Sequence, residues 1–166
     1  MALLHALKDV RTIKTLLTRA GAEAVRSGDD LPGPEHLLLS ALALPDGTAA
    51  AAFTHLGVDP GDFRTAVDRT HRDALDHLGL TVGDGLDDLP GADTPAGPYR
   101  MTASGQQAFQ RAVTLSKETK PSLLRAAHIV IAVCEQGRGT VARALQTQGI
   151  DRIHLAAAAR EALATP

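Results

Sequence analysis

Aromatic residues are scarce in this 166-residue chain: they make up 2% of it, and tryptophan is absent. The hydrophobic share of 44% must therefore come mostly from leucine, alanine, valine and isoleucine. Because leucine and alanine favour helix over strand, the composition indicates a helical domain with an aliphatic core. The shortage of rings also leaves little for base stacking, and a formal net charge of -2 gives no basic excess. A nucleic-acid partner is therefore not expected.

Cysteine and long apolar runs are also scarce. The single cysteine, Cys134, excludes an internal disulfide and fits a reducing compartment. The apolar run at the amino terminus is too short for a signal peptide. No stretch approaches the roughly 20 apolar residues of a membrane span. We therefore expect a cytoplasmic protein that has no membrane partner.

Familiar catalytic motifs are missing as well. The sequence has no phosphate-binding G-x-x-x-x-G-K-[ST], no G-x-S-x-G, no H-E-x-x-H and no paired C-x-x-C. His71 and His77 flank two aspartates, but a separation of six residues puts their rings on different faces of a helix. Cys134 lies in an apolar run and is interpreted as a buried structural thiol. The sequence thus predicts no catalysis, no cofactor and no metal.

An internal repeat becomes visible when one half of the chain is placed on the other with an offset of 92 residues. The matches include glycine and aspartate punctuation, which is harder to obtain by chance than matched alanines. We therefore predict a single domain, 1–166, with a first repeat at 10–80 and a second at 101–165, related by a near two-fold rotation. The matched positions are His36 and His128, Gly47-Thr48 and Gly139-Thr140, Gly57 and Gly149, and Asp59 and Asp151.

The segment 81–100 between the repeats is rich in glycine, proline and aspartate. It is typical of a solvated linker or an ordered loop, and a segment that folds over a groove between the repeats is the alternative. Each repeat is predicted to form four helices, so the fold class is all-α with two tandem four-helix repeats. The run at 128–134 looks like a buried strand when taken alone, but its match to the run after His36 favours a central helix.

Several residues mark where these helices begin and end. The first helix is expected at 10–27 and its counterpart at 102–119, with Thr102 as the amino-terminal cap. The second helix should open at Pro34, because proline is favoured in the first position. The glycines and aspartates matched above should end the third helices and cap the fourth. A histidine repeated at the start of a buried helix is expected to be a core residue that hydrogen-bonds the backbone.

The repeated block resembles a known family. P-E-H-L-L-L-S-A-L, followed by G-T-A-A-A-A-F-T-H-L-G-V-D, is similar to the amino-terminal Clp repeat domain of Clp unfoldases, particularly the ClpC type. The second copy, which includes A-A-H-I-V-I-A-V-C, is similar but more diverged. The resemblance implies a non-catalytic module that receives adaptor and substrate proteins for Clp unfoldase and protease components. The ATPase modules are missing from this sequence, which fits either a free-standing receptor domain or a piece of a longer protein.

The resemblance also implies a site for phosphorylated arginine, in which the glutamate of each T-E-H motif faces the guanidinium. Glu35 keeps that glutamate, while Pro34 replaces the threonine before it. Ala127, preceded by Ala126, replaces the glutamate in the second repeat. One site at most is therefore expected, near Glu35 and Pro34, where helix-start amides could hold phosphate. The alternative is that Glu35 only complements the helix dipole.

Other functions stay open at this point. Within the family resemblance, the protein either recruits clients to a Clp machine or acts as a decoy that sequesters small peptide-like ligands, including cyclic peptides. A regulatory helical protein that docks one partner, and a small enzyme with an unrecognised site, are interpretations from other classes. An enzyme would need a nucleophile and a base together in a cleft.

Overall fold

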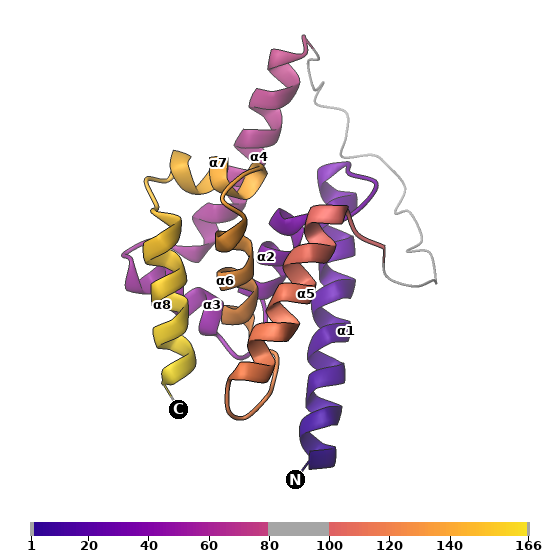
Figure 1. Cartoon of the computed structure of the whole chain (residues 1–166). Helices are drawn as coiled ribbons and strands as arrows, with labels where there is room; N and C mark the ends of the chain where they lie inside the picture. The colour runs from indigo at the N-terminus through magenta and orange to yellow at the C-terminus, as the bar shows by residue number, and fades with distance from the viewer. Residues whose placement is uncertain (1, 80–99, 166) are drawn as a thin grey trace.

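The structure describes residues 2–79 and 100–165, which form eight α-helices joined by loops and contain no β-strand. This computed structural model confirms the predicted all-α class with two four-helix units (Figure 1). The predicted linker, 81–100, lies outside the described residues except for Arg100. The helices are α1 Ala2–Ser27, α2 Pro34–Leu42, α3 Thr48–His55, α4 Pro60–His77, α5 Ala103–Glu118, α6 Ala126–Gln136, α7 Thr140–Thr147 and α8 Arg152–Ala164.

The helix ends confirm the predicted caps. The side chains of Asp59 and Asp151 each accept a hydrogen bond of 2.8 Å from the amide two residues later, at the starts of α4 and α8. Thr102 Oγ1 accepts a bond of 3.1 Å from the third amide after it, at the start of α5. Gly57 and Gly149 follow α3 and α7 with φ of 72° and 70°. Glycine adopts this left-handed conformation without the penalty that a Cβ would bring.

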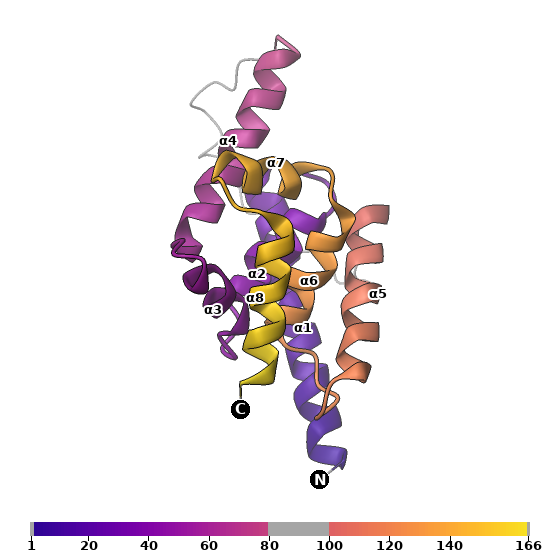
Figure 2. The same ribbon diagram turned by 60° about the vertical axis from the view of Figure 1, so that its left-hand side comes forward.

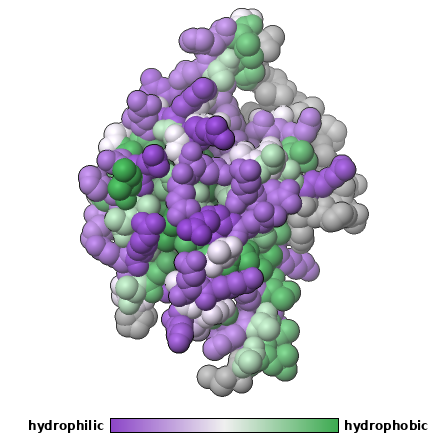
Figure 3. Space-filling model, in the orientation of Figure 1, coloured by the Kyte–Doolittle hydropathy of each residue, from purple (hydrophilic) through white to green (hydrophobic). Residues whose placement is uncertain are grey.

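The first helix differs from the prediction, because α1 begins at Ala2 rather than at residue 10. Leu3, Leu4 and Leu7 are exposed on these added turns, and so is Val10 directly after them. Figure 3 shows the hydrophobic side chains at the lower end of the molecule, over the projecting start of α1. Alanine, leucine and lysine extend a helix by intrinsic propensity alone. A core-facing pattern cannot reveal such turns, since they contribute nothing to the core.

Helix pairs that are equivalent in the two units pack against each other in the same way. Helix α3 of the first unit packs against α8, and α7 of the second unit packs against α4. Helices α2 and α6, which are equivalent, pack against each other in the middle (Figure 2). A contact pattern that survives exchange of the units is what an approximate two-fold relation requires. Each unit therefore completes the core of the other.

The segment 126–134 is buried at every position. It forms most of α6, so the run that resembles a strand by composition is a helix that is apolar all round. The core includes an aromatic pair, in which the ring centroids of the fully buried Phe53 and Phe63 lie 5.7 Å apart. One continuous cluster of buried side chains spans both units.

His36 and His128 are fully buried at the starts of α2 and α6. The Nδ1 atom of each accepts a hydrogen bond from the amide three residues earlier, at 3.0 Å and 2.9 Å respectively. The Nε2 atoms lie 3.3 Å from Ser27 Oγ and 3.2 Å from Thr119 Oγ1. The matched histidines are thus core residues that tie each helix start to the preceding segment, as predicted.

Burial lowers the pKa of His128. Below the ordinary histidine pKa of about 6.5 the unfolded chain therefore binds more protons, and the free energy of unfolding must fall as the pH falls. We expect His128→Gln to lower the free energy of unfolding at pH 7 by about 1–3 kcal/mol, because its buried partners lose a bond. Between pH 7 and 5, however, the variant should lose less stability than the wild type.

Urea denaturation at several pH values measures both effects. The control for removing an imidazole is His154→Gln, since His154 is 75% exposed. An equally steep loss of stability in the His128 variant and the wild type would contradict the role assigned to this ring.

Candidate functional site

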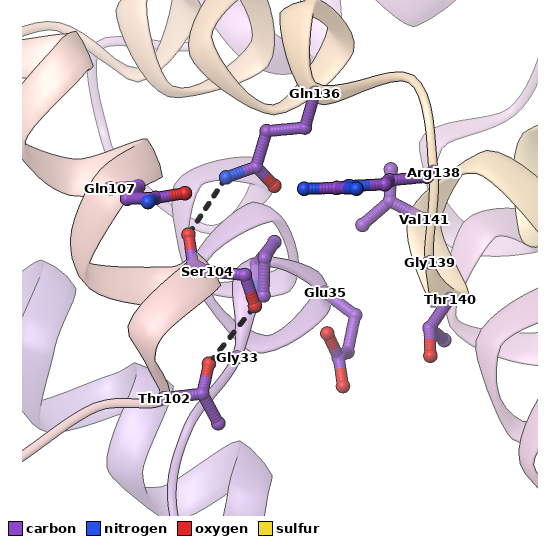
Figure 4. Close-up of a pocket in the computed structure, with 11 residues that line it drawn as sticks. Gly33, Glu35, Thr102, Ser104, Gln107, Gln136, Arg138, Gly139, Thr140 and Val141 are labelled. Atoms are coloured by element: carbon purple, nitrogen blue, oxygen red, sulfur yellow. Dashed lines mark hydrogen bonds between the residues drawn. The ribbon is translucent and has the colours of Figure 1, made fainter.

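A pocket of about 490 Å³ lies where the two units meet. Three segments form its walls: the start of α2, the start of α5 and the turn between α6 and α7 (Figure 4). Most of its side chains are polar or charged, which suits a hydrophilic ligand. The lining residues are Gly33, Pro34, Glu35, Thr102, Ser104, Gln107, Gln136, Arg138, Gly139, Thr140 and Val141.

Glu35 supplies the carboxylate of this pocket from the first turn of α2, and its side chain is 14% exposed. Its Oε1 atom lies 3.7 Å from His71 Nε2 and 3.8 Å from His36 Nδ1. Burial alone would raise the pKa of Glu35, but the contact with His71, the backbone amide and the nearby imidazoles outweigh it and hold that pKa below its usual value. The same contact raises the pKa of His71. Glu35 is therefore an anion at neutral pH.

Arg138 supplies the cation of the pocket, from the turn between α6 and α7. Its side chain points into the pocket from the wall opposite α5, above Glu35 in Figure 4. Beside it, Gln136 Nε2 donates a hydrogen bond of 2.8 Å to the backbone oxygen of Ser104, which joins α6 to α5. The pocket thus carries one negative and one positive group on different walls.

The start of α5 reaches the pocket because Gly105 permits a close approach. The amide of Thr102 donates a hydrogen bond of 3.0 Å to the Pro32 carbonyl oxygen. A Cβ on Gly105 would lie 3.0 Å from that oxygen and 3.3 Å from the Cα of Gly33. Since backbone atoms cannot move aside as a flexible side chain does, a larger residue at 105 would push α5 away from the pocket.

The equivalent helix start in the second unit is closed by the protein itself. Asp46 Oδ2 accepts a hydrogen bond of 2.9 Å from the amide of Ala126. Thr48 Oγ1 accepts one of 2.8 Å from the amide of Ala127. Both acceptors belong to the first unit, so the first unit caps α6. The amides that could hold an anion at this position are taken.

The positions equivalent to Asp46 and Thr48 are Arg138 and Thr140, 92 residues later. At the start of α2, the other unit therefore contributes a cation, whereas at the start of α6 it contributes a capping carboxylate. At the start of α2, Pro34 has no amide hydrogen, and the His36 amide donates a hydrogen bond of 3.1 Å to the Gly33 carbonyl oxygen. One of two equivalent helix starts is thus sealed, and the other opens into a charged pocket.

The structure brings Glu35 and Pro34 together in the pocket, while Ala127 lies buried beneath the internal cap. Sequence reasoning missed Arg138. The offset of 92 residues already sets it opposite Asp46, and that reversal of charge is the signal that could have found it. The sequence did not indicate the contact between His71 and Glu35, because the two residues come from different helices.

Cys134 is 2% exposed, in the middle of the core. Burial raises the pKa of its thiol to about 12. A thiol that stays protonated at physiological pH is a poor nucleophile. This agrees with the structural interpretation of Cys134.

Comparisons with known proteins give the family. The family model described as the Clp repeat (R) N-terminal domain matches residues 11–148. The chain belongs to this family. Among curated relatives of this Clp repeat domain, "Chaperone protein ClpC, chloroplastic" from Pisum sativum is 39% identical over 72 residues, which is 43% of this chain and 8% of that protein. "Chaperone protein ClpC1, chloroplastic" from Oryza sativa subsp. japonica is 38% identical over 72 residues, which again cover 43% of this chain and 8% of that protein.

The matched part of this chain therefore covers less than a tenth of the length of these relatives. Among solved structures, the N-terminal domain of the chaperone ClpD from Arabidopsis thaliana has a TM-score of 0.59 at 19% sequence identity. That match covers 95% of this chain and 92% of the other, and it shows a shared fold. No helix among the described residues is long and apolar enough to cross a membrane.

We expect Asp46→Ala to lower the free energy of unfolding by about 1–2 kcal/mol, because the start of α6 loses its cap. Denaturant titration measures the change. The control is Asp73→Ala on α4, an exposed carboxylate for which residues 2–79 and 100–165 supply no hydrogen-bond partner. We expect this change to stay within about 0.5 kcal/mol of zero. Equal stability of the two variants would show that the cap between the units adds nothing.

Proposed function

We propose that this Clp repeat domain is a non-catalytic receptor for protein segments, with one working site for phospho-arginine in the pocket that contains Glu35 and Arg138. The observation that carries the proposal is the placement of a carboxylate and a guanidinium on different walls of one pocket. Phospho-arginine carries a phosphoryl group directly on its guanidinium, so it presents both signs of charge at one end. A pocket with both signs is complementary to it.

Each part of the ligand has a counterpart in the pocket. The Glu35 carboxylate can accept paired hydrogen bonds from the guanidinium nitrogens. Arg138 can donate to the phosphoryl oxygens, together with the hydroxyl of Thr140 and the first-turn amides of α7. Pro34 has no amide hydrogen. It therefore cannot donate a hydrogen bond to the Glu35 carboxylate.

The partners that follow from this chemistry are proteins that bear phosphorylated arginine, as substrates or adaptors of a Clp unfoldase and protease. The names of the relatives support a link to Clp chaperones but describe proteins of which this chain covers a small part. Such a receptor would act in the cytoplasm, modulate Clp proteolysis and need no cofactor. Only one site per chain is proposed, because the second helix start lacks the glutamate and is capped.

Calorimetric titration with free phospho-arginine tests the site, with plain arginine as the comparison ligand. We expect one phospho-arginine per chain and no heat from arginine. Glu35→Gln and Arg138→Gln should each weaken binding about 10-fold to 100-fold, since each removes hydrogen bonds to a charged group worth about 1.5–3 kcal/mol. Glu118→Gln, which changes an exposed carboxylate on α5 outside the pocket, should bind as the wild type does.

Ala127→Glu extends the test to the second unit. Because Ala127 is fully buried, circular dichroism must first show that this variant is folded. The folded variant regains the carboxylate but keeps the α6 amides bound to Asp46 and Thr48, so the stoichiometry should stay at one. No heat and no thermal stabilisation of the wild type, at ligand concentrations well above a millimolar Kd, would refute the proposal.

A further inference from the structure

We propose that Asp29, Glu35 and His71 form a binding site for one divalent transition-metal ion of the zinc type. The three side chains come from different elements: the loop after α1, the first turn of α2 and the middle of α4. Two carboxylates and one imidazole are ligands that Zn²⁺ accepts in proteins. The site uses the Oε1 atom of Glu35 that lies toward His71 on α4. Because the same carboxylate lines the phospho-arginine pocket, the two ligands would share Glu35, but the metal proposal does not depend on phospho-arginine binding.

The spacing of the donor atoms is close to what a metal needs. One ligand atom from each of Asp29, Glu35 and His71 lies within 4.8 Å of the other two. Glu35 Oε1 and His71 Nε2 are 3.7 Å apart. Around tetrahedral zinc, with bonds of about 2.0–2.2 Å, neighbouring ligand atoms are about 3.4 Å apart. Small side-chain rotations, without movement of the helices, would complete the contraction.

A buried imidazole holds Asp29 in place. His36 Nδ1 accepts the hydrogen bond from the Gly33 amide, so the ring hydrogen is assigned to Nε2. That Nε2 lies 3.2 Å from Asp29 Oδ2, and the His36 side chain is 1% exposed. Ser27 Oγ lies 3.3 Å from the same nitrogen, so the ring contacts one Asp29 oxygen electrostatically and leaves the other for an ion. Polar contacts outside the ligand set commonly orient metal ligands.

The three ligands can be reached from solvent to different extents. The side chain of Asp29 is 43% exposed, that of His71 25% and that of Glu35 14%. An ion could therefore enter from the Asp29 side and keep a water molecule as a fourth ligand. Two carboxylates and a neutral imidazole carry two negative charges, which a divalent cation would balance.

The second unit shows that the helix packing does not require this triad. The positions equivalent to Asp29, Glu35 and His71 are Pro121, Ala127 and Leu163. All three are apolar, although the second unit keeps the buried histidine at the equivalent of His36. The histidine is thus common to both units, while the three donors meet in one unit only.

Titration of untagged, metal-free protein with Zn²⁺ tests the site by calorimetry, and Co²⁺ absorption reports the ligands directly. We expect one ion per chain and a visible Co²⁺ band. His71→Asn and Asp29→Asn should each weaken Zn²⁺ binding by at least about 10-fold to 100-fold, which is the loss that follows removal of even an outer-shell group. His77→Asn, six residues further along α4 and exposed, is the matched control and should bind like the wild type.

Circular dichroism of each variant shows whether it is folded. Asp29 is well exposed, so its variant keeps the test decisive if the His71 variant fails to fold. Absence of Zn²⁺ binding by the wild type would overturn the proposal. Zn²⁺ binding that both triad variants retain, or that the His77 variant loses, would also overturn it by placing the ion elsewhere. Because only the metal is added, failure here is distinct from failure to bind phospho-arginine.

Discussion

The structure depends on the exchange of packing surfaces between two equivalent four-helix units. Helix α3 covers α8, α7 covers α4, and α2 meets α6 at the centre, so a single apolar cluster runs through both units. A helix with one apolar stripe has to bury that stripe against another element, and here the other unit supplies part of the partner surface. The consequence for function is that the helix starts of one unit face the turns of the other. The pocket at Glu35 and the cap on α6 are both products of this arrangement.

The starts of α6 and α2 are equivalent in the two units, but the side chains beside them carry opposite charges. First-turn amides need acceptors, and at α6 the Asp46 carboxylate and the Thr48 hydroxyl supply them from across the unit boundary. At α2 the equivalent place is taken by Arg138, which donates hydrogen bonds and cannot accept them. An anion from outside the protein would balance the charge of this cation. A duplicated fold can therefore keep one copy of a site as structure and leave the other available to a ligand.

Glu35 lies at the meeting point of two polar environments. On one side it faces a pocket with a guanidinium, and on the other it contacts the imidazole of His71. A carboxylate that is largely buried must be paired or hydrogen-bonded, and the histidine contacts supply that pairing in the protein alone. The residue that marks the family resemblance is therefore ionised and held in place before any ligand binds.

The sequence by itself determined the local and repeated features: the helical class, the caps at Thr102, Asp59 and Asp151, and the buried histidine of each unit. These depend on propensity, on side chains that bond amides two or three residues away, and on an offset visible in the letters. Only the tertiary structure decided which distant side chains meet: Arg138 with the Glu35 pocket, Asp46 with α6, and His71 with Asp29 and Glu35. The physical reason is that these pairings depend on how whole helices pack, and residue spacing within one helix carries no information about the rotation or offset of another. The early start of α1 at Ala2 also lay beyond the sequence pattern, since exposed turns leave no trace in a pattern defined by burial.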